Sequence, residues 1–544
     1  MKIGVALVSL MAIFWLATGT LLKPPMVKTP LGVIEGTYSK GELIPVKQFL
    51  GVPYATPPLG KLRFLRPEPV KPWSGTYKAN KQPHACMQYT EQPFPWYDNM
   101  TGKSEDCLYL NIYTPLRATK FSKFPVFFWI FGGGLTLGSN RLDVYDGTTL
   151  AKKEDLIVVT INYRLGLFGF FTSNSSDAPG NVGLYDMVMA LQWVNDNIQY
   201  FGGDKKRITI AGESAGSISV SILCVSPLTK GLFSRAILES GSVTFYKYNG
   251  LGYNLNLGEK VAEAVGCATK DFTLYDHPEK VVQCLRSKNA TYLTKTLWSF
   301  NPLSTSSLFP QYGDSLLPNN ALDDLRNGNF NNVPILAGDV KNEGSFLLTS
   351  AFPDVFGFFG EKDPKINKTY GRTLIAGAFA NFTNPQKYID YYLNSVPDTD
   401  YYQIRKQVYE AYGDTIVECH TVYFAESYAK RQNKVYYYDF THRPSNTPWA
   451  PWMGVAHFEE VQFVFGRPLR VPKDYDSKDI WVSKKVLKIW GDFARNGRPS
   501  LIPKWPLYSK KDHTYFTIDK DNYGKLGTGP HLKNCDFLRS FYGF

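Results

Sequence analysis

The 544-residue sequence predicts an α/β fold in which helices flank a large, mostly parallel central sheet. The first observation is a set of short runs rich in apolar, aromatic and β-branched residues, the pattern of strands that are buried on both faces. The second is a segment between two of these runs in which apolar residues recur at helical spacing. Strand, helix and strand in this order form the βαβ unit of α/β proteins.

Five runs are predicted to be strands of the sheet. They cover residues 124–131, 156–162, 207–211, 333–338 and 435–440. A helix is predicted over 183–200, where Leu184, Met187 and Leu191 share one face. The stretches 71–102 and 291–320 are irregular and rich in Pro and aromatic residues, and we expect them to be loops over one end of the sheet. Catalytic groups commonly lie on such loops.

The first residues have the pattern of a secretory signal peptide. Lys2 precedes an apolar run over residues 3–16, and small residues follow at 17–19. The run is short for a bilayer span, which disfavours the alternative of an uncleaved anchor. We expect a signal peptide over 1–19, no membrane span after its removal, and a single domain over 20–544 in a secreted, extracellular protein. No long linker, charge block or internal repeat divides the chain.

Secretion predicts that most of the seven cysteines are paired. Seven is an odd number, so at least one cysteine stays unpaired, and proximity in sequence favours the pairs Cys86–Cys107 and Cys267–Cys284. Asn-x-Ser/Thr sequons predict glycosylation at the surface. They begin at Asn99, Asn174, Asn289, Asn367 and Asn381.

The net charge is +12, from 60 basic and 48 acidic residues. A basic surface favours anionic partners. The sequence has no long run of Lys and Arg and no nucleic-acid-binding motif. We therefore expect a solvated basic surface without a nucleic-acid partner, and we expect neither a cofactor nor a metal.

Ser214 has the surroundings of a nucleophile. It lies in Gly-Glu-Ser-Ala-Gly (212–216), directly after a predicted strand. A serine at a tight strand-to-helix turn needs small neighbours because its backbone is strained. Its hydroxyl attacks only when a base removes the proton. In this type of fold a histidine that follows the nucleophile supplies the base, and this order excludes only His84 among the seven histidines.

The reaction also needs amide donors for the oxyanion that forms on attack. Residues 132–134 are three glycines that follow a predicted strand upstream of Ser214, which is where this type of fold supplies such donors. A flexible glycine loop is the alternative interpretation.

Several motifs in order along the chain resemble the cholinesterase and type-B carboxylesterase branch of the α/β-hydrolases. The matching stretches include FLGVPYA (49–55), SEDCLYLN (104–111), NYR (162–164) and FGGD (201–204). The resemblance runs from about residue 27 to residue 535. It implies the α/β-hydrolase fold over one catalytic domain, and hydrolysis of small-molecule esters.

The resemblance also implies a catalytic triad. The nucleophile motif of the family falls on Ser214, its acid motif on Glu343 in KNEGS (341–345), and its histidine motif on His457 in WMGVAH (452–457). In the implied mechanism His457 deprotonates Ser214 and Glu343 holds the imidazolium. The amides implied as oxyanion donors are those of Gly133, Gly134 and Ala215.

The family pattern implies further structural features. Its disulfides fall on Cys86–Cys107, Cys267–Cys284 and Cys419–Cys535, which leaves Cys224 free and buried. A buried ion pair is implied for Arg63 and Glu105, and a supporting carboxylate for Glu460. We expect a monomer or a non-covalent dimer.

Within the family, the stretches PWAPWMGV (448–455) and LDVY (142–145) resemble the cholinesterase subgroup. Aromatic faces hold a quaternary ammonium by cation–π attraction, and the acid next to the nucleophile, Glu213, is implied near this cation. The residues expected to bind substrate are Glu213, Phe346, Trp96, Trp449 and Tyr145.

Three departures from the cholinesterase pattern bear on the substrate. The loop between the cysteines at 86 and 107 is shorter, and Trp96 is the nearest candidate for the choline-binding tryptophan. Thr305 and Ser307 stand where acetylcholine-selective members have phenylalanines, which predicts a roomier acyl pocket. Phe131 replaces the usual His or Tyr before the glycine triplet, which removes a polar group near the oxyanion site.

Three functions are compatible with these features. The first is a cholinesterase-like hydrolase of choline esters with a broad acyl range. The second is a general carboxylesterase for uncharged xenobiotic, lipid or hormone esters. The third is an inactive adhesion or binding protein of the same fold, which an intact triad disfavours.

Overall fold

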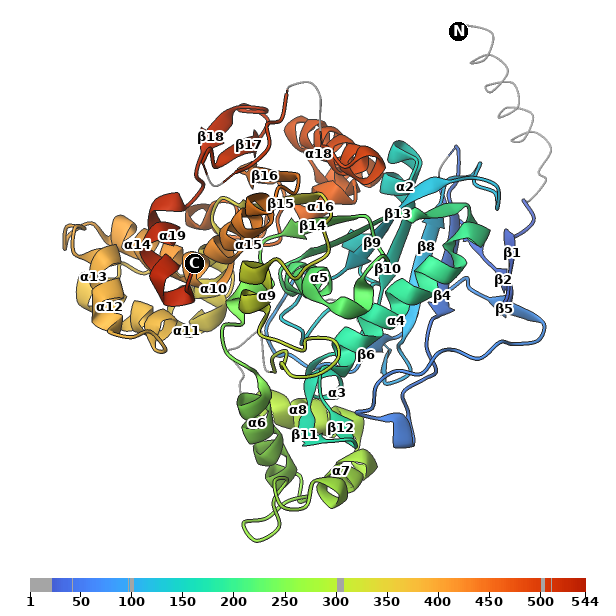
Figure 1. Ribbon diagram of the computed structural model, residues 1–544. Coiled ribbons are helices and arrows are strands. Elements are labelled where there is room, and N and C mark those ends of the chain that lie inside the picture. Colours follow the sequence, from blue (N-terminus) through green and yellow to red (C-terminus); the bar gives the residue numbers. More distant parts are fainter. Residues whose placement is uncertain are drawn as a thin grey trace, which may run out of the picture.

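The computed structural model describes residues 22–41, 43–95, 97, 102–300, 308–499, 504–509 and 511–544. The predicted signal peptide, Trp96, Asn99, Thr305 and Ser307 lie outside the described residues. The centre of the molecule is an 11-stranded sheet with helices on both of its faces (Figure 1). The predicted α/β-hydrolase architecture is confirmed.

The large sheet is parallel in its middle and antiparallel at its two edges. In spatial order its strands are β18 (Leu526–Thr528), β17 (Thr514–Ile518), β16 (Val435–Phe440), β15 (Ile335–Val340), β14 (Arg235–Glu239), β13 (Gly203–Glu213), β9 (Phe124–Ile130), β10 (Ile157–Ile161), β8 (Tyr109–Thr114), β4 (Lys47–Pro53) and β3 (Thr37–Tyr38). All pairs between β17 and β10 are parallel, so the carboxyl ends of these strands meet at one edge.

All five predicted strands are present as β9, β10, β13, β15 and β16. Each has the buried residues expected of a strand covered on both faces. Strand β13 begins earlier than predicted, at Gly203, with a polar stretch that is part of the sheet. Strands β14 and β8 and the edge strands were not predicted from the sequence.

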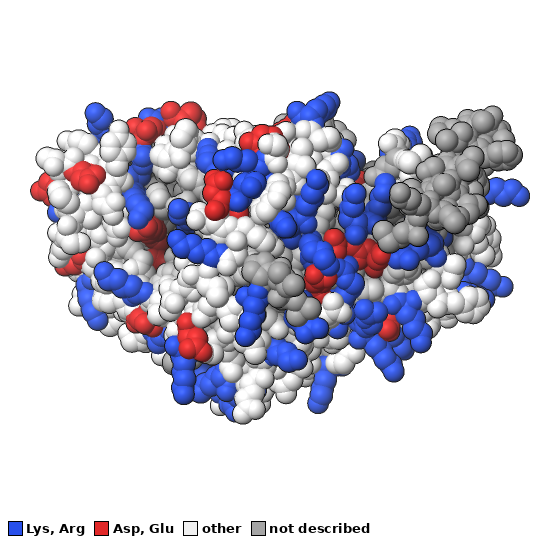
Figure 2. All heavy atoms as spheres, turned by 90° about the horizontal axis from the view of Figure 1, so that it is seen from above, with Lys and Arg blue, Asp and Glu red and all other residues white. Residues whose placement is uncertain are grey.

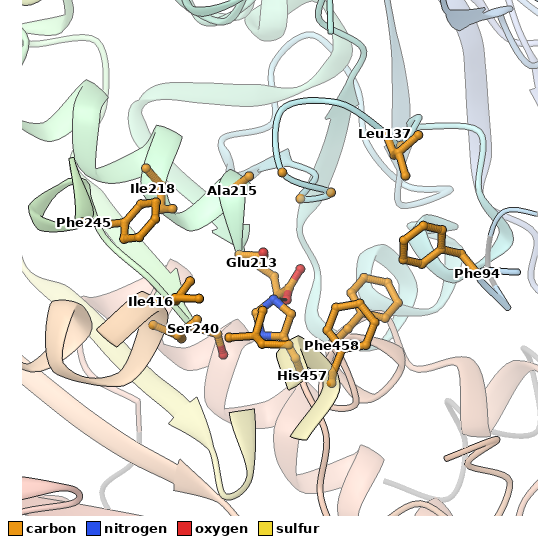
Figure 3. Close-up of a pocket in the computed structure, with 18 of the residues that line it drawn as sticks. Phe94, Leu137, Glu213, Ala215, Ile218, Ser240, Phe245, Ile416, His457 and Phe458 are labelled. Carbon is orange, nitrogen blue, oxygen red and sulfur yellow. Dashed lines mark ion pairs between the residues drawn. The ribbon is translucent and has the colours of Figure 1, made fainter. Parts of the chain in front are cut away.

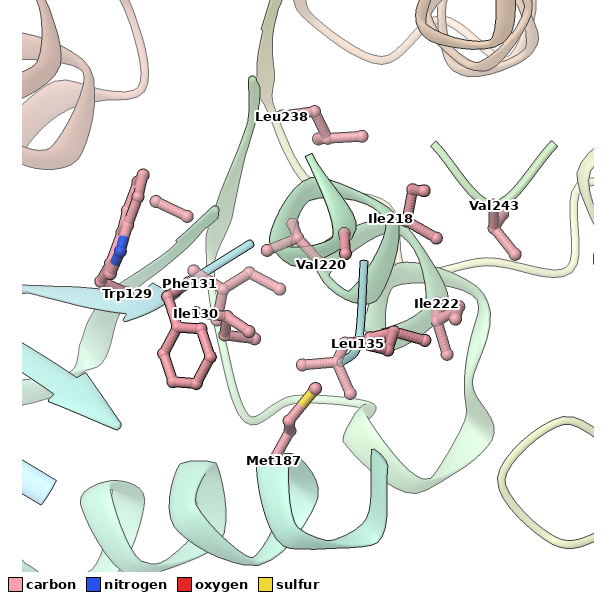
Figure 4. Packing of buried hydrophobic residues seen from close by; sticks show 14 of the residues in the cluster. Trp129, Ile130, Phe131, Leu135, Met187, Ile218, Val220, Ile222, Leu238 and Val243 are labelled. Atoms are coloured by element: carbon pink, nitrogen blue, oxygen red, sulfur yellow. The ribbon is translucent and has the colours of Figure 1, made fainter. Parts of the chain in front are cut away.

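Helices cover both faces of the sheet (Figure 1). Helix α5 (Ala215–Val225) packs on β9, β13 and β14. Helix α4 (Val182–Asn197) is present where a helix was predicted over 183–200. The other face carries α2 (Thr148–Glu154) and α18 (Ser477–Asn496). Figure 4 shows apolar side chains of α4 and α5, among them Met187 and Ile222, packed with Ile130 and Leu238 from the sheet.

The remaining elements surround this core. The other helices are α3 (Gly166–Phe170), α6 (Leu251–Ala264), α7 (Pro278–Ser287), α8 (Ala290–Phe300), α9 (Ala321–Asn327), α10 (Glu343–Ala351), α11 (Pro353–Phe356), α12 (Lys368–Ala376), α13 (Pro385–Leu393), α14 (Tyr401–Gly413), α15 (Cys419–Lys430), α16 (Val461–Val464), α17 (Arg467–Arg470) and α19 (Leu532–Tyr542). One small sheet has three strands, β1 (Met26–Thr29), β2 (Gly32–Glu35) and β5 (Thr76–Lys78). Two further sheets have two strands each: β6 (Ala85–Cys86) with β7 (Lys103–Ser104), and β11 (Thr172–Ser175) with β12 (Ala178–Pro179).

The expectation of a loop over 291–320 is wrong in its first part, which belongs to helix α8. Leu293, Leu297 and Trp298 recur at helical spacing and are buried, so the apolar pattern outweighs the neighbouring loop-like composition. The stretch 71–102 is largely irregular in its described residues, as predicted, with only the short strands β5 and β6.

Three disulfides tie the periphery together, and all three implied pairs are confirmed. They are Cys86–Cys107, Cys267–Cys284 and Cys419–Cys535. Cys224 forms no disulfide in the described chain and is buried, as expected. Within the described chain, no helix has the length and apolar character needed to cross a lipid bilayer.

The surface carries the basic character of the composition. On the face seen in Figure 2, Lys and Arg side chains are spread widely between fewer acidic groups. Four of the five sequon asparagines lie on exposed positions of the described chain, namely Asn174, Asn289, Asn367 and Asn381.

Candidate active site

A pocket of about 230 Å³ lies at the carboxyl ends of the central parallel strands (Figure 3). Ser214 follows β13, Ser240 follows β14, and the glycine triplet follows β9. All of these residues line the pocket together with His457. This edge is where open parallel sheets carry their binding sites, since loops from several strands converge there.

Ser214 sits in the strained turn that the sequence predicted between β13 and α5. Its backbone has φ 58° and ψ −126°, a conformation that non-glycine residues rarely adopt. Added Cβ atoms at the flanking glycines would clash: one at Gly212 would lie 2.6 Å from the carbonyl carbon of Gly216, and one at Gly216 would lie 2.1 Å from Ile130 O. The amide of Ser214 donates to Glu239 O at 2.8 Å. The small residues of the motif are therefore required for this turn.

Glu343 is the first residue of α10, separated from the end of β15 by two residues, and it is fully buried. Its Oε1 accepts a hydrogen bond from the Val340 amide at 2.8 Å, and its Oε2 lies 2.5 Å from Nδ1 of His457. A Cβ on Gly344 would lie 1.7 Å from the carbonyl oxygen of Tyr409, which explains the glycine in this motif. The structure thus brings the predicted acid and the predicted histidine into direct contact.

The loop that carries His457 is fixed by Asn342, the neighbour of Glu343. The Asn342 side chain accepts from the Val455 amide at 3.0 Å, and the Asn342 amide donates to the Val455 carbonyl at 3.0 Å. Gly454 has φ 64°, and a Cβ there would lie 2.1 Å from Asn342 Oδ1. The Trp-Met-Gly-Val motif therefore fixes the segment that carries His457 against the segment that carries Glu343, and this contact positions the acid next to the imidazole.

The imidazole of His457 lies between two carboxyl groups. Its Nε2 is 3.1 Å from Glu213 Oε1. Burial lowers the pKa of His457, but the charge and the hydrogen bond of Glu343, together with the charges of Glu460 and Asp339, outweigh burial and raise that pKa above its usual value of 6.5.

Three buried glutamates lie behind the nucleophile. Glu213 and Glu239 are register partners on β13 and β14, so their side chains share one face of the sheet, and Ser240 Oγ donates to Glu460 at 3.5 Å. Burial raises the pKa of Glu213 and Glu460 well above their usual range, with further contributions from neighbouring carboxylates. Burial also raises the pKa of Glu239 to about 8, although Trp490 Nε1 donates to it at 2.8 Å.

The glycine triplet approaches the nucleophile closely. A Cβ on Gly132 would lie 2.9 Å from the Cβ of Ser214, so only glycine allows this approach. Gly133 has φ 99°, and its carbonyl oxygen accepts from the amides of Thr136 and Leu137 at 3.0 and 2.9 Å, which fixes the loop. The residues predicted as oxyanion donors that line the pocket are Gly133, Gly134 and Ala215.

Of the residues expected to bind substrate, Glu213, Tyr145 and Phe346 line the pocket. The ring of Phe346 stacks on the His457 imidazole at 5.9 Å between centroids. Trp449 does not line this pocket: its ring packs behind Phe346 at 5.4 Å, and it faces a neighbouring cavity. Trp449 therefore supports Phe346 rather than forming the pocket wall.

Most of the apolar pocket wall was not predicted from the sequence. The additional lining residues are Phe94, Leu137, Leu142, Ile218, Phe245, Tyr246, Phe309, Leu347, Ile416, Val417 and Phe458. Phe94 comes from the aromatic-rich loop at 71–102, whose composition was a signal. Ile416 and Val417 come from a π-helical turn next to α15, and no local motif marks them.

Two further expectations concern structural residues. Arg63 forms the implied ion pair with Glu105, with its Nε donating to Glu105 Oε2 at 2.7 Å. Phe131 was expected near the oxyanion site, but its ring is buried, stacks on Tyr163 at 4.4 Å and does not line the pocket. The ring packs between Tyr163 and Tyr145 instead of facing the pocket.

Comparison with known proteins agrees with this geometry. The family model described as "Carboxylesterase family" matches residues 23–538. Acetylcholinesterase-1 of Trittame loki is 40% identical over 536 residues, which cover 95% of this chain and 94% of that protein. Acetylcholinesterase of Leptinotarsa decemlineata is 37% identical over 95% of this chain and 86% of its own length. Acetylcholinesterase of Bungarus fasciatus is 37% identical over 91% of this chain and 83% of its own length.

Proposed function

Since this chain belongs to the carboxylesterase family and is a cholinesterase-type serine ester hydrolase, we propose that it cleaves choline esters through an acyl-enzyme on Ser214. The observation that carries the proposal is the constellation at the carboxyl edge of the sheet. A serine in a strained turn shares one pocket with a histidine whose Nδ1 lies 2.5 Å from a fully buried glutamate.

In the proposed reaction, His457 removes the proton of Ser214 as Oγ attacks the ester carbonyl. Glu343 stabilises the imidazolium that forms and fixes the tautomer that carries a proton on Nδ1. His457 then gives its proton to the leaving alcohol, and water hydrolyses the acyl-enzyme by the same proton transfers in reverse. The amides assigned to the oxyanion are those of Gly133, Gly134 and Ala215.

The aromatic side of the pocket supports a choline group as the leaving alcohol. Phe346, Tyr145 and Phe94 line the same pocket as the acid Glu213. A quaternary ammonium gains about 0.5–2 kcal/mol over an aromatic face, which is about 2- to 30-fold in affinity. We also propose that esters with acyl groups larger than acetyl are hydrolysed, because Thr305 and Ser307 are small residues.

One observation favours the second candidate, a general carboxylesterase for uncharged esters. Burial raises the pKa of Glu213 well above its usual range. A neutral carboxylic acid attracts a cation less strongly than a carboxylate does, so the discrimination between charged and uncharged esters would then rest on the aromatic rings alone.

The test compares kcat/KM for acetylcholine with that for 3,3-dimethylbutyl acetate, in which carbon replaces the charged nitrogen. The proposal predicts a preference of about 2- to 30-fold for acetylcholine. Equal values would reject the choline-ester specificity and favour the general carboxylesterase. Butyrylcholine should be hydrolysed with an efficiency similar to that of acetylcholine, and a steep preference for acetyl would reject the roomier acyl pocket.

We further propose that the protein is secreted, glycosylated at its sequons, and a monomer or non-covalent dimer with one catalytic domain over 20–544. Three disulfides support an oxidising compartment. The exposure of the four described sequon asparagines supports glycosylation, and one 11-stranded sheet supports a single domain. A shift in mass on treatment with an N-glycosidase, and sedimentation of the purified protein, test these points.

A further inference from the structure

A second cavity, of about 540 Å³, adjoins the catalytic pocket. Its wall is more polar than that of the catalytic pocket and includes Asp143, Glu459 and Arg467. Among the described residues, Leu142 and Phe458 line both the pocket and this cavity. These two side chains therefore form the partition between the two spaces.

Phe458 has an unusual backbone. Its φ is 81°, in a region that bulky residues seldom adopt. The turn is closed by the Glu459 amide, which donates to the carbonyl oxygen of Ala456 at 3.2 Å. As a result the consecutive side chains of His457 and Phe458 both face the catalytic pocket. The chain adopts a strained conformation here, and its effect is to place an aromatic ring against the reaction site.

The ring of Phe458 forms part of the pocket wall beside His457. It contacts the ring of Tyr145 edge to face at 6.3 Å between centroids. Figure 3 shows it beside His457, on the side where Phe94 lies, whereas Phe245 lies at the opposite end. The side with Tyr145 and Phe94 is the side assigned above to the leaving alcohol.

We propose that Phe458 is a specificity-determining residue that closes the alcohol side of the pocket and limits the size of the leaving alcohol. The inference rests on the proposed function, because it requires acyl transfer at Ser214. The acyl group stays on Ser214 during the reaction, and the space assigned to it is the end of the pocket with Phe245, opposite this partition. Without the ring, the alcohol group would reach the second cavity.

The second cavity also determines which alcohol groups the pocket would accept once the Phe458 ring is removed. Glu459 is buried, with 4% of its surface exposed, and its Oε1 accepts a hydrogen bond from Thr447 Oγ1 at 2.7 Å. Gln462 and Asn446 add amide groups to the same wall. Opening the partition should therefore admit bulky alcohols, because it adds the space of the second cavity to the alcohol side of the pocket.

The test uses two variants of the full chain, Phe458→Gly and Phe458→Ala, with phenyl acetate and 1-naphthyl acetate as substrates. These esters share the acyl group and differ in the size of the alcohol. We expect the ratio of kcat/KM, naphthyl over phenyl, to rise about tenfold or more, the size of effect that one excluded group has in an apolar pocket. Glycine adopts a positive φ freely, so the glycine variant carries the test if alanine disturbs folding.

Phe245→Ala is the matched control, because it removes an aromatic ring from the opposite end of the same pocket. It should leave the naphthyl-to-phenyl ratio within about twofold of wild type. Titration with an organophosphonate counts the folded, reactive sites in each variant. An unchanged ratio in the folded Phe458→Gly variant, or an equal rise in Phe245→Ala, would overturn the role of Phe458. Phenyl acetate hydrolysis that persists in Ser214→Ala would instead overturn the proposed function.

Discussion

Replacing Glu343 with glutamine removes one charge and keeps the shape of the side chain. Oε2 lies 2.5 Å from Nδ1 of His457, and the exposed fractions of the two residues are 0% and 5%, so water does not screen the pair. Unit charges about 4 Å apart attract by about 4 kcal/mol at an effective dielectric constant near 20. This attraction exists when the imidazolium forms during attack and is absent while the ring is neutral. We expect Glu343→Gln to lower kcat/KM about 10³-fold.

The assay is release of thiol from acetylthiocholine, normalised to active sites by organophosphonate titration at long times. Glu239→Gln is the matched control, since Glu239 is also fully buried but bonds to Trp490 instead of His457. The control should stay within about tenfold of wild type. A Glu343→Gln enzyme that retains more than a tenth of wild-type kcat/KM would refute the reasoning, and so would an equal loss in Glu239→Gln.

Three further predictions concern pH and local geometry. The rate constant kcat/KM should rise with pH along a limb centred above 6.5, because the neutral imidazole is the base and the pKa of His457 is raised; a limb centred below 6 would contradict this. Folding raises the pKa of Glu239 from 4.5 to about 8, so the unfolded chain loses this proton first and wild-type stability falls between these pH values. Between pH 4.5 and 8, the free energy of unfolding of Glu239→Gln, measured by urea titration, should fall by a few kcal/mol less than that of wild type. An equal pH dependence in the two proteins would contradict the raised pKa of Glu239. Gly454→Ala should cost about 1–3 kcal/mol of stability and about 10² in kcat/KM, since its Cβ would lie 2.1 Å from Asn342 Oδ1; a fully active, equally stable variant would exclude that role.

The central strands could be predicted from the sequence because a strand that is buried on both faces is a continuous run of apolar residues. Strands β9 and β16 are such runs, and they lie where they were predicted. The edge strand β18 has no buried residue, and no such run marks it. Helix α8 was missed because Pro and aromatic residues near it resemble a loop, although its own apolar spacing is helical.

In the site, too, local features could be predicted from the sequence and long-range contacts could not. The turn around Ser214 is local, so its strain and its glycines could be deduced from five residues. His457 and Glu343 are 114 residues apart, and only the family resemblance linked them before the structure brought them together. The position of Trp449 behind Phe346, and of Phe458 on the partition, depends on how loops pack at the sheet edge. No local pattern encodes such packing.

The central claim is that Ser214 forms the acyl-enzyme. Treatment of the protein with an organophosphonate ester, followed by proteolysis and mass spectrometry, locates the modified residue, and residual hydrolysis of acetylthiocholine is measured in the same sample. We predict one adduct per chain, on the peptide that contains Ser214, with activity lost in proportion, and neither labelling nor activity in Ser214→Ala. An adduct on another residue, or activity that survives in Ser214→Ala, would contradict the account.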